Sequence, residues 1–161
     1  MDRIEIKPAL LEDVETILHL QMRAYLSEAE IYNDYSILPL IQTLNEIKQE
    51  FSQQVFLKAI EEEEEDGSII GSVRGYLERE TACIGRLIVK PESQNKGIGT
   101  RLMHAIEEHF KFADRYELFT GHKSARNLYL YQKLGYREFK RIPVSDTLVM
   151  VYLEKYHNNE K

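Results

Sequence analysis

The sequence contains one cysteine, Cys83, and no tryptophan. A single cysteine excludes an internal disulfide and a Cys-x-x-Cys pair for zinc binding or thiol exchange, so a reducing, cytoplasmic location is expected. Long apolar runs are also absent: no uncharged stretch approaches the ~20 residues that span a bilayer, and residues 1–8 lack the apolar core of a signal peptide. We therefore expect a cytoplasmic protein with no membrane partner.

Basic residues are in the minority. The chain has 21 Lys and Arg against 27 Asp and Glu, a formal net charge of −6, and the six consecutive acids at 61–66 account for the whole surplus. No basic stripe is present, so nucleic acid is not expected as a partner. With 161 residues, 43% of them hydrophobic, the chain can bury a full core, and we expect a single domain over 1–161.

Hydrophobic periodicity and turn residues predict an alternating series of strands and helices. Strands are expected at 3–7, 55–60, 68–78, 82–89, 116–120, 137–141 and 148–154. Helices are expected from a cap at Asp13 to about 28–30, within 31–53 with Pro39 in the first turn, at 98–110, and at 125–134 closed by Gly135. Asp66-Gly67 predicts a tight hairpin turn, and Pro143 separates the last two strands.

The resulting order is β-α-α-β-β-β-α-β-α-β-β. It predicts an α/β (α+β) fold, a mixed and mostly antiparallel sheet of about seven strands flanked by about four helices.

A glycine-containing turn lies between the fourth predicted strand and the helix at 98–110. Its residues are Gln94, Asn95, Lys96, Gly97, Ile98, Gly99 and Thr100. Free N–H groups and the positive end of the helix dipole favour an anion at such a turn. Taken alone, so short a motif is more simply explained as a loop. The spacing excludes a P-loop, and the third glycine of a dinucleotide turn is replaced by Leu102.

Residues 87–99 resemble the acetyl-CoA signature of the GNAT N-acetyltransferases, whose core pattern Q/R-x-x-G-x-G/A is met by Gln94, Gly97 and Gly99. A second block at 127–136, NLYLYQKLGY, resembles the helix end typical of that family. The element order also agrees with the family over nearly the whole chain. The resemblance implies an acetyltransferase that uses acetyl-CoA as co-substrate and acts on an amine acceptor by direct attack in a ternary complex.

The resemblance also implies roles for individual residues. The backbone of Leu87, Ile88 and Val89 is expected to pair with the pantetheine arm and to hold the thioester oxygen, and the amides from Gln94 to Thr100 to hold the pyrophosphate. Tyr131, four residues before Gly135, is expected to protonate the leaving thiolate. Asparagine is frequent in this family seven residues before that tyrosine, where this chain has Ser124. Either Ser124 or Asn127 is therefore expected to contact the pantetheine amides.

Several assignments stay open at this level. No general base is evident, with Glu78, Glu117 and His122 as candidates and a water chain or a neutral amine as alternatives. Cys83 is more simply a buried core residue than an acyl carrier, and His104 with Glu108 does not define a metal site, so no metal is expected.

The sequence leaves open whether the protein is catalytic, whether it forms a dimer, and which acceptor it uses. A non-catalytic acyl-CoA-binding regulatory module is the alternative function, and a homodimer is possible. Acids at 28, 30 and 34, in a segment that walls the acceptor site in the family, suggest a cationic amine.

Overall fold

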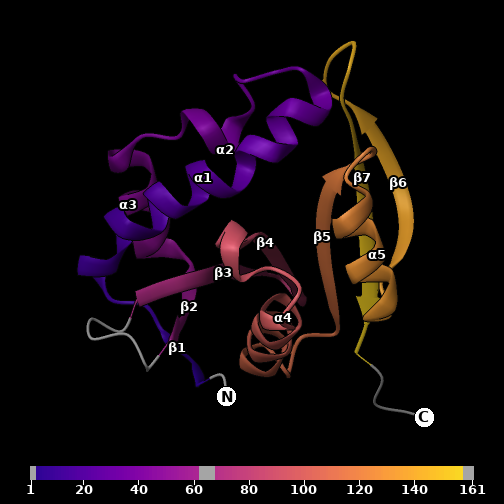
Figure 1. Cartoon of the computed structure of the whole chain (residues 1–161). Coiled ribbons are helices and arrows are strands. Elements are labelled where there is room, and N and C mark those ends of the chain that lie inside the picture. The colour runs from indigo at the N-terminus through magenta and orange to yellow at the C-terminus, as the bar shows by residue number, and fades with distance from the viewer. Residues whose placement is uncertain (1–2, 62–67, 158–161) are drawn as a thin grey trace.

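The computed structural model describes residues 3–61 and 68–157, and these contain seven strands (Figure 1). The strands are β1 (Ile4–Pro8), β2 (Val55–Glu61), β3 (Ser68–Glu78), β4 (Thr81–Val89), β5 (Arg115–Gly121), β6 (Arg137–Pro143) and β7 (Val149–Tyr156). The helices are α1 (Val14–Tyr32), α2 (Leu38–Ile41), α3 (Leu44–Gln53), α4 (Ile98–His109) and α5 (Ala125–Lys133). Short 3-10 turns, η1 (Leu11–Asp13) and η2 (Pro91–Ser93), precede α1 and follow β4.

All seven strands form one sheet in the order β1-β2-β3-β4-β5-β7-β6. Every neighbouring pair is antiparallel except β4 and β5, which run parallel. The predicted fold class, a mixed and mostly antiparallel seven-stranded sheet, is therefore confirmed. The expectation of about four helices is corrected to five in the described residues, because the segment 31–53 contains two helices rather than one.

The break between α2 and α3 has a local cause. Pro39 lies in the first turn of α2, as predicted, and the chain turns extended at Gln42. Thr43 then starts α3 with a capping box, since its hydroxyl accepts the N–H of Glu46 (3.1 Å) while the Glu46 carboxylate accepts the N–H of Thr43 (2.9 Å). The Thr-x-x-Glu spacing is visible in the sequence and is the signal for the second helix.

Asp13 directly precedes α1, as predicted, but its side chain does not cap that helix. The carboxylate instead accepts the N–H of Leu10 (2.7 Å) and the ammonium of Lys58 on β2 (2.6 Å). The predicted capping role is therefore wrong, because the partly buried Lys58 of a distant strand and the backbone of Leu10 compete for the carboxylate.

Other boundaries lie within a few residues of the predictions, and Pro143 ends β6 rather than following it. The predicted turn at Asp66-Gly67 lies outside the described residues.

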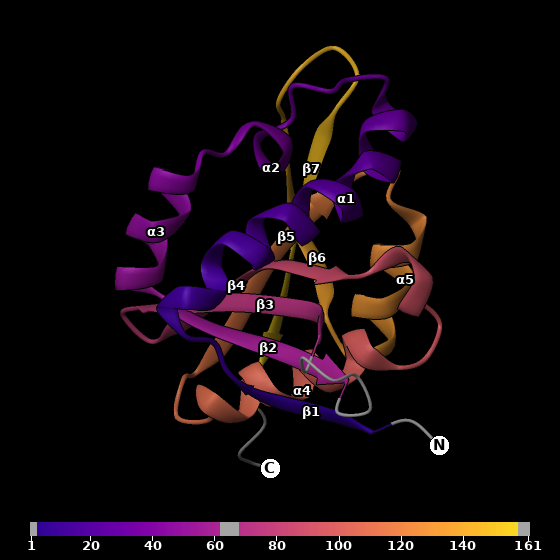
Figure 2. The same cartoon turned by 60° about the vertical axis from the view of Figure 1, so that its left-hand side comes forward.

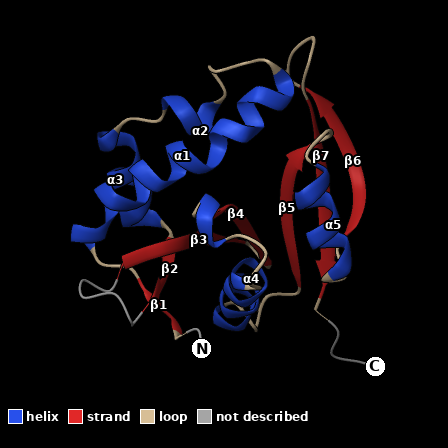
Figure 3. Cartoon of the chain, viewed as in Figure 1, coloured by secondary structure: helices blue, strands red, loops and turns tan. Residues whose placement is uncertain are grey.

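Helices cover both faces of the sheet (Figures 2 and 3). One buried cluster joins α1 and α3 to the strands through Val14, Ile17, Ile47, Phe56 and Ile88. The larger cluster on the opposite face packs α4 and α5 against the strands, and it includes Leu102, Ile106, Val73, Tyr131 and Leu153. The strand β4 contributes to both clusters, so both faces of this strand are held by packing.

The end of β5 packs tightly against the end of α1. A Cβ at Gly121 would lie 2.1 Å from the Tyr32 hydroxyl oxygen and 3.1 Å from Leu148. We expect Gly121→Ala to destabilise the protein by about 1–3 kcal/mol, because the ring of Tyr32 must move out of a filled site. Thermal unfolding measures this loss. The matched control is Gly85→Ala, which meets no atom within 4 Å and should unfold at the parent temperature; equal Tm values for the two variants would contradict the prediction.

Candidate active site

The parallel strands β4 and β5 pair only at their beginnings. Their register runs from Thr81 opposite Arg115 to Cys83 opposite Glu117 and then stops. Beyond that point β4 continues to Val89 and β5 to Gly121, and Figure 1 shows the two strands diverging. The edge of residues 84–89 that faces β5 is therefore free of strand pairing, and its backbone groups are available to an extended ligand.

A bulge in β4 lies on this free edge. Arg74 of β3 is opposite Gly85 and Ser72 is opposite Ile88, so Val73 faces two β4 residues. One of them, Arg86, has a positive φ of 50°. A bulge bends its strand and changes the direction of the local side chains and amides. It increases the divergence of β4 from β5 at the point where the pairing has ended.

The turn that follows β4 has the conformation of an anion site. Asn95 and Gly97 adopt positive φ values of 67° and 80°, and a Cβ at Gly97 would enter open space. Gly97 is the N-cap of α4 and supplies no side-chain cap, which leaves the N–H groups of the first turn of α4 without intrahelical acceptors. Open space beside free amides at a helix start fits a phosphate group.

A pocket of about 580 Å³ joins the free edge to this turn. Of the residues predicted to bind the co-substrate, ten line it: Leu87, Ile88, Val89, Gln94, Asn95, Gly97, Ile98, Gly99, Thr100 and Asn127. Lys96, the remaining one, lies in the turn but does not line the pocket. Side chains of α1 and α5 complete the walls.

Sequence reasoning missed part of this lining. Arg126, Tyr129, Leu130 and Lys133 line the pocket from α5, and Tyr25 and Glu28 from α1. The guanidinium of Arg126 donates to the side-chain oxygen of Asn95 in the glycine turn (3.3 Å). Tyr129, Leu130 and Lys133 follow Arg126 by three, four and seven positions, which is the spacing of one helix face. This spacing is visible in the sequence and is the signal that could have identified the α5 lining.

Ser124 and Asn127 both line the pocket, but they differ in their bonding. The Ser124 hydroxyl donates to the Glu28 carboxylate and lies 2.9 Å from the Tyr32 hydroxyl, which in turn accepts the N–H of Lys123. Asn127 uses only its amide nitrogen, which donates to the Thr120 hydroxyl (3.2 Å). Ser124 is thus committed to holding α1 against α5, whereas the carbonyl oxygen of Asn127 is available to a ligand.

Tyr131 is buried, with 6% of its surface exposed, and its ring packs edge-on against Tyr136. Burial raises the pKa of its phenol well above the usual value, and the nearby Tyr25 and Glu28 raise this pKa further. The phenol therefore keeps its proton at any physiological pH. Tyr131 reaches the neighbourhood of Tyr25 and Glu28, which line the pocket, although it is not itself one of the lining residues.

None of the remaining sequence candidates lines this pocket. Glu117 pairs with Arg115 (2.9 Å), Glu78 is exposed at the end of β3, and the His122 ring accepts the N–H of Val149 (3.0 Å). Cys83 is half-buried, and burial raises the pKa of its thiol, which opposes the thiolate that an acyl carrier needs.

In residues 3–61 and 68–157, no group of three or more His, Cys, Asp or Glu residues could hold a metal ion. No helix there is both long and apolar enough to cross a membrane.

A sheet that opens between two parallel strands beside a glycine turn defines the acetyltransferase class of mixed α/β folds. A family model described as an acetyltransferase (GNAT) domain matches residues 54–138, just over half of the chain. The chain therefore belongs to the GNAT acetyltransferase family, as its sequence motifs predicted.

Known proteins agree with this assignment. The structure of PaiA N-acetyltransferase from Thermoplasma acidophilum, in complex with coenzyme A, has a TM-score of 0.69 and 25% identity, over 96% of this chain and 99% of that one. YncA, a putative acetyltransferase from Salmonella typhimurium with acetyl-CoA, has the same fold with a TM-score of 0.74 and 19% identity, covering 99% and 96% of the two chains.

A curated protein also matches by sequence. UPF0157 protein YqkA from Bacillus subtilis is 24% identical over 140 residues. The match covers 87% of this chain and 39% of YqkA, so the chain spans well under half the length of that relative.

Proposed function

We propose that this protein transfers the acetyl group of acetyl-CoA to a primary amine by direct attack in a ternary complex. The main support for the proposal is the edge of β4 at residues 84–89 that has no strand partner. The pocket joins this edge to the glycine turn. Coenzyme A in the PaiA structure and acetyl-CoA in the YncA structure support the choice of co-substrate.

The chain offers three kinds of group to acetyl-CoA. The backbone of Leu87 to Val89 can pair with the amides of the pantetheine arm as an added strand would. The free amides at the start of α4 and the guanidinium of Arg126 can hold the negatively charged pyrophosphate. The backbone N–H groups beside the β4 bulge can donate to the thioester oxygen, which gains negative charge when the amine attacks.

Tyr131 supplies the proton that completes the transfer. When the tetrahedral intermediate collapses, the carbon–sulfur bond breaks and the thiolate leaves. Burial raises the pKa of the Tyr131 phenol and so keeps it protonated until the thiolate forms. The thiolate is poorly solvated in the pocket and is the base that takes this proton. The resulting phenolate is reprotonated from solvent or by the proton that the amine loses.

Release of free CoA tests the proposal. The purified chain is incubated with acetyl-CoA and a panel of polyamines, amino acids, aminoglycosides and peptide N-termini, and free thiol is measured against a no-amine blank. Amine-dependent release is expected. A thermal shift with acetyl-CoA but no release with any amine would support the non-catalytic acyl-CoA-binding module instead, and the absence of any thermal shift would contradict both functions.

We expect Asn127→Ala to raise the KM for acetyl-CoA about three- to tenfold, because it removes one hydrogen bond to the pantetheine arm. Its Tm should fall less than that of Ser124→Ala, because it loses a single internal hydrogen bond, to the Thr120 hydroxyl. Ser124→Ala is the comparison. It should lower Tm, since the Glu28 carboxylate and the Tyr32 hydroxyl lose a buried partner. Steady-state kinetics and thermal unfolding of both variants measure the difference. The opposite pattern would assign the pantetheine contact to Ser124.

A further inference from the structure

A second pocket, of about 370 Å³, opens between β4 and β5 where their pairing ends. It is lined by β3, β4, β5 and β7 together with Glu50 and Gln54 at the end of α3. Its β4 lining runs from Cys83 to Arg86, and the lining of the first pocket begins at Leu87. A thioester laid along Leu87 to Val89 would therefore end beside the second pocket, which makes this pocket the approach for an acceptor.

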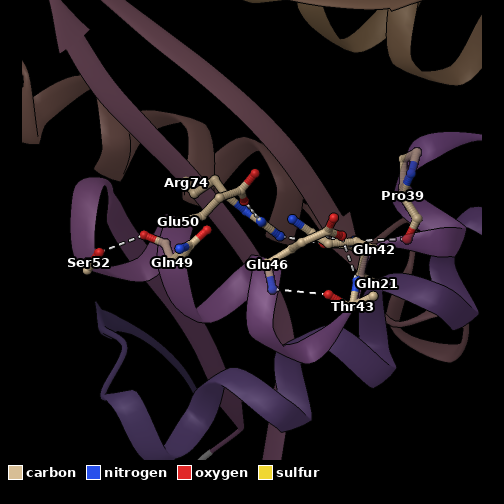
Figure 4. Close-up of polar contacts among 9 residues, drawn as sticks. All are labelled: Gln21, Pro39, Gln42, Thr43, Glu46, Gln49, Glu50, Ser52 and Arg74. Atoms are coloured by element: carbon tan, nitrogen blue, oxygen red, sulfur yellow. Dashed lines mark hydrogen bonds and ion pairs between the residues drawn. The ribbon is translucent and has the colours of Figure 1, made fainter.

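Arg74 is the most deeply buried charged residue of this second pocket, with 2% of its surface exposed. Figure 4 shows its guanidinium bonded to the Glu50 carboxylate and to the side-chain oxygen of Gln21. Gln21 is held in turn by the Pro39 carbonyl (2.9 Å) and by Gln42 (3.0 Å). Burial lowers the pKa of Arg74 to about 10, so the group is still charged at pH 7. Its Nε atom is buried and has no hydrogen-bond partner in the described residues.

Arg86 adds a second guanidinium to the same pocket. It lies at the β4 bulge with positive φ. Its guanidinium is within hydrogen-bonding reach of the Tyr25 phenol, and its positive charge also acts on Arg74. The Nε atom of Arg86 is likewise buried without a hydrogen-bond partner in the described part of the chain. Within residues 3–61 and 68–157, Arg86 forms no ion pair.

Three acids line the pocket, and one of them is bonded to these arginines. Glu50 is bound to Arg74, and Glu117 is bound to Arg115 at the other side of the pocket. Glu78 lies exposed at the rim. Glu50 is therefore the one lining acid bonded to either of these two guanidiniums, and the Nε–H donors of both arginines remain without a partner in the described residues. A buried unpaired donor costs free energy unless a ligand satisfies it.

We propose that the acceptor is an amine that also carries an anionic oxygen group, a carboxylate or a phosphate, and that Arg86, supported by Arg74, binds this group. A guanidinium offers a fork of N–H donors that matches either oxyanion. The exposed acid at the rim, Glu78, suits the ammonium end of the same molecule. The inference rests on the proposed function and specifies its acceptor class.

The acids at 28, 30 and 34 suggested a cationic amine as the acceptor. The proposed acceptor is more specific, because it carries an anionic group in addition to the amine. Of those three, only Glu28 lines the co-substrate pocket, where it is bonded to Ser124. The Asp34 carboxylate is occupied by the backbone and hydroxyl of Ser36.

Matched ligand pairs test the proposal on the CoA-loaded protein. L-Phenylalanine is compared with phenylethylamine, which lacks only the carboxylate, and O-phosphoethanolamine with ethanolamine. In calorimetric titration, at least one of the two compounds with an anionic group should bind about tenfold more tightly, or better, than its partner without that group. Comparison of the two pairs shows whether the site prefers a carboxylate or a phosphate. Arg86→Gln should abolish that preference, and Arg86→Lys should restore part of it. Arg137→Gln, an exposed arginine of β6, is the control and should keep the preference.

Equal binding of the two members of each pair in the parent protein would overturn the proposal without any variant having to fold. A preference that survives in folded Arg86→Gln would overturn the role of Arg86. Parallel measurement of CoA release separates this inference from the proposed function. Arg86-dependent binding of an amine with an anionic group, without CoA release, would support the anion site and contradict acetyl transfer. CoA release only with amines that lack an anionic group would support acetyl transfer and contradict the anion site.

Discussion

Tyr131→Phe is expected to lower kcat for acetyl transfer by about 10²- to 10⁴-fold, the range typical for loss of a positioned general acid. The substitution removes one oxygen from a side chain that is 6% exposed, and the ring contact with Tyr136 is kept. The affinity for acetyl-CoA and the Tm should therefore change little. Initial rates of CoA release, together with a titration of acetyl-CoA by thermal shift, measure both properties.

The pH profile provides a second test of Tyr131. Because burial raises the pKa of this phenol above about 10, the phenol stays protonated at lower pH, and its ionisation should cause no loss of rate there.

The control for Tyr131→Phe is Tyr156→Phe, which changes an exposed tyrosine at the end of β7 and should retain the parent kcat. A kcat for Tyr131→Phe equal to that of this control would remove Tyr131 from the mechanism.

Gly97→Val is expected to weaken acetyl-CoA binding by about 30-fold or more. A β-branched residue at φ 80° costs about 1–2 kcal/mol of backbone strain, and its side chain would fill the open space beside the free amides of α4. The loss should appear in KM for acetyl-CoA rather than in kcat at saturation. Steady-state kinetics with varied acetyl-CoA give this split.

Arg79→Val controls for strain alone. Arg79 also has a positive φ, 58°, but it lies in the β3–β4 turn and lines neither pocket described above. We expect this variant to lose stability and to keep the parent KM. If Gly97→Val and Arg79→Val shifted KM equally, backbone strain rather than a blocked anion site would explain the effect.

Local patterns accounted for most of the secondary structure. Alternation and turn residues predicted the strands within a few positions, and the apolar spacing after Gly97 predicted α4. The predictions that were wrong involved competition between partners. Asp13 bonds Lys58 of β2 instead of capping α1, and the Thr43–Glu46 box divides the segment that periodicity alone joined into one helix.

The co-substrate side of the site was also predictable, because its residues lie in two continuous stretches of sequence. Ten of the eleven predicted binding residues line one pocket. The α1 lining, Tyr25 and Glu28, was not predicted, since it meets the glycine turn and α5 only through packing across the sheet. The same holds for Arg74 and Arg86, which are twelve residues apart on neighbouring strands and give no motif.

The sequence by itself determined the family, the order of strands and helices along the chain, and the turn that suits a phosphate, because these depend on short-range spacing and on backbone conformations that few residues adopt. Only the tertiary structure decided where β4 leaves β5, which of Ser124 and Asn127 is available to a ligand, and that two arginines share one pocket. The physical reason is that burial, electrostatic proximity and hydrogen-bond competition depend on which distant segments meet, and a one-dimensional pattern does not contain that information.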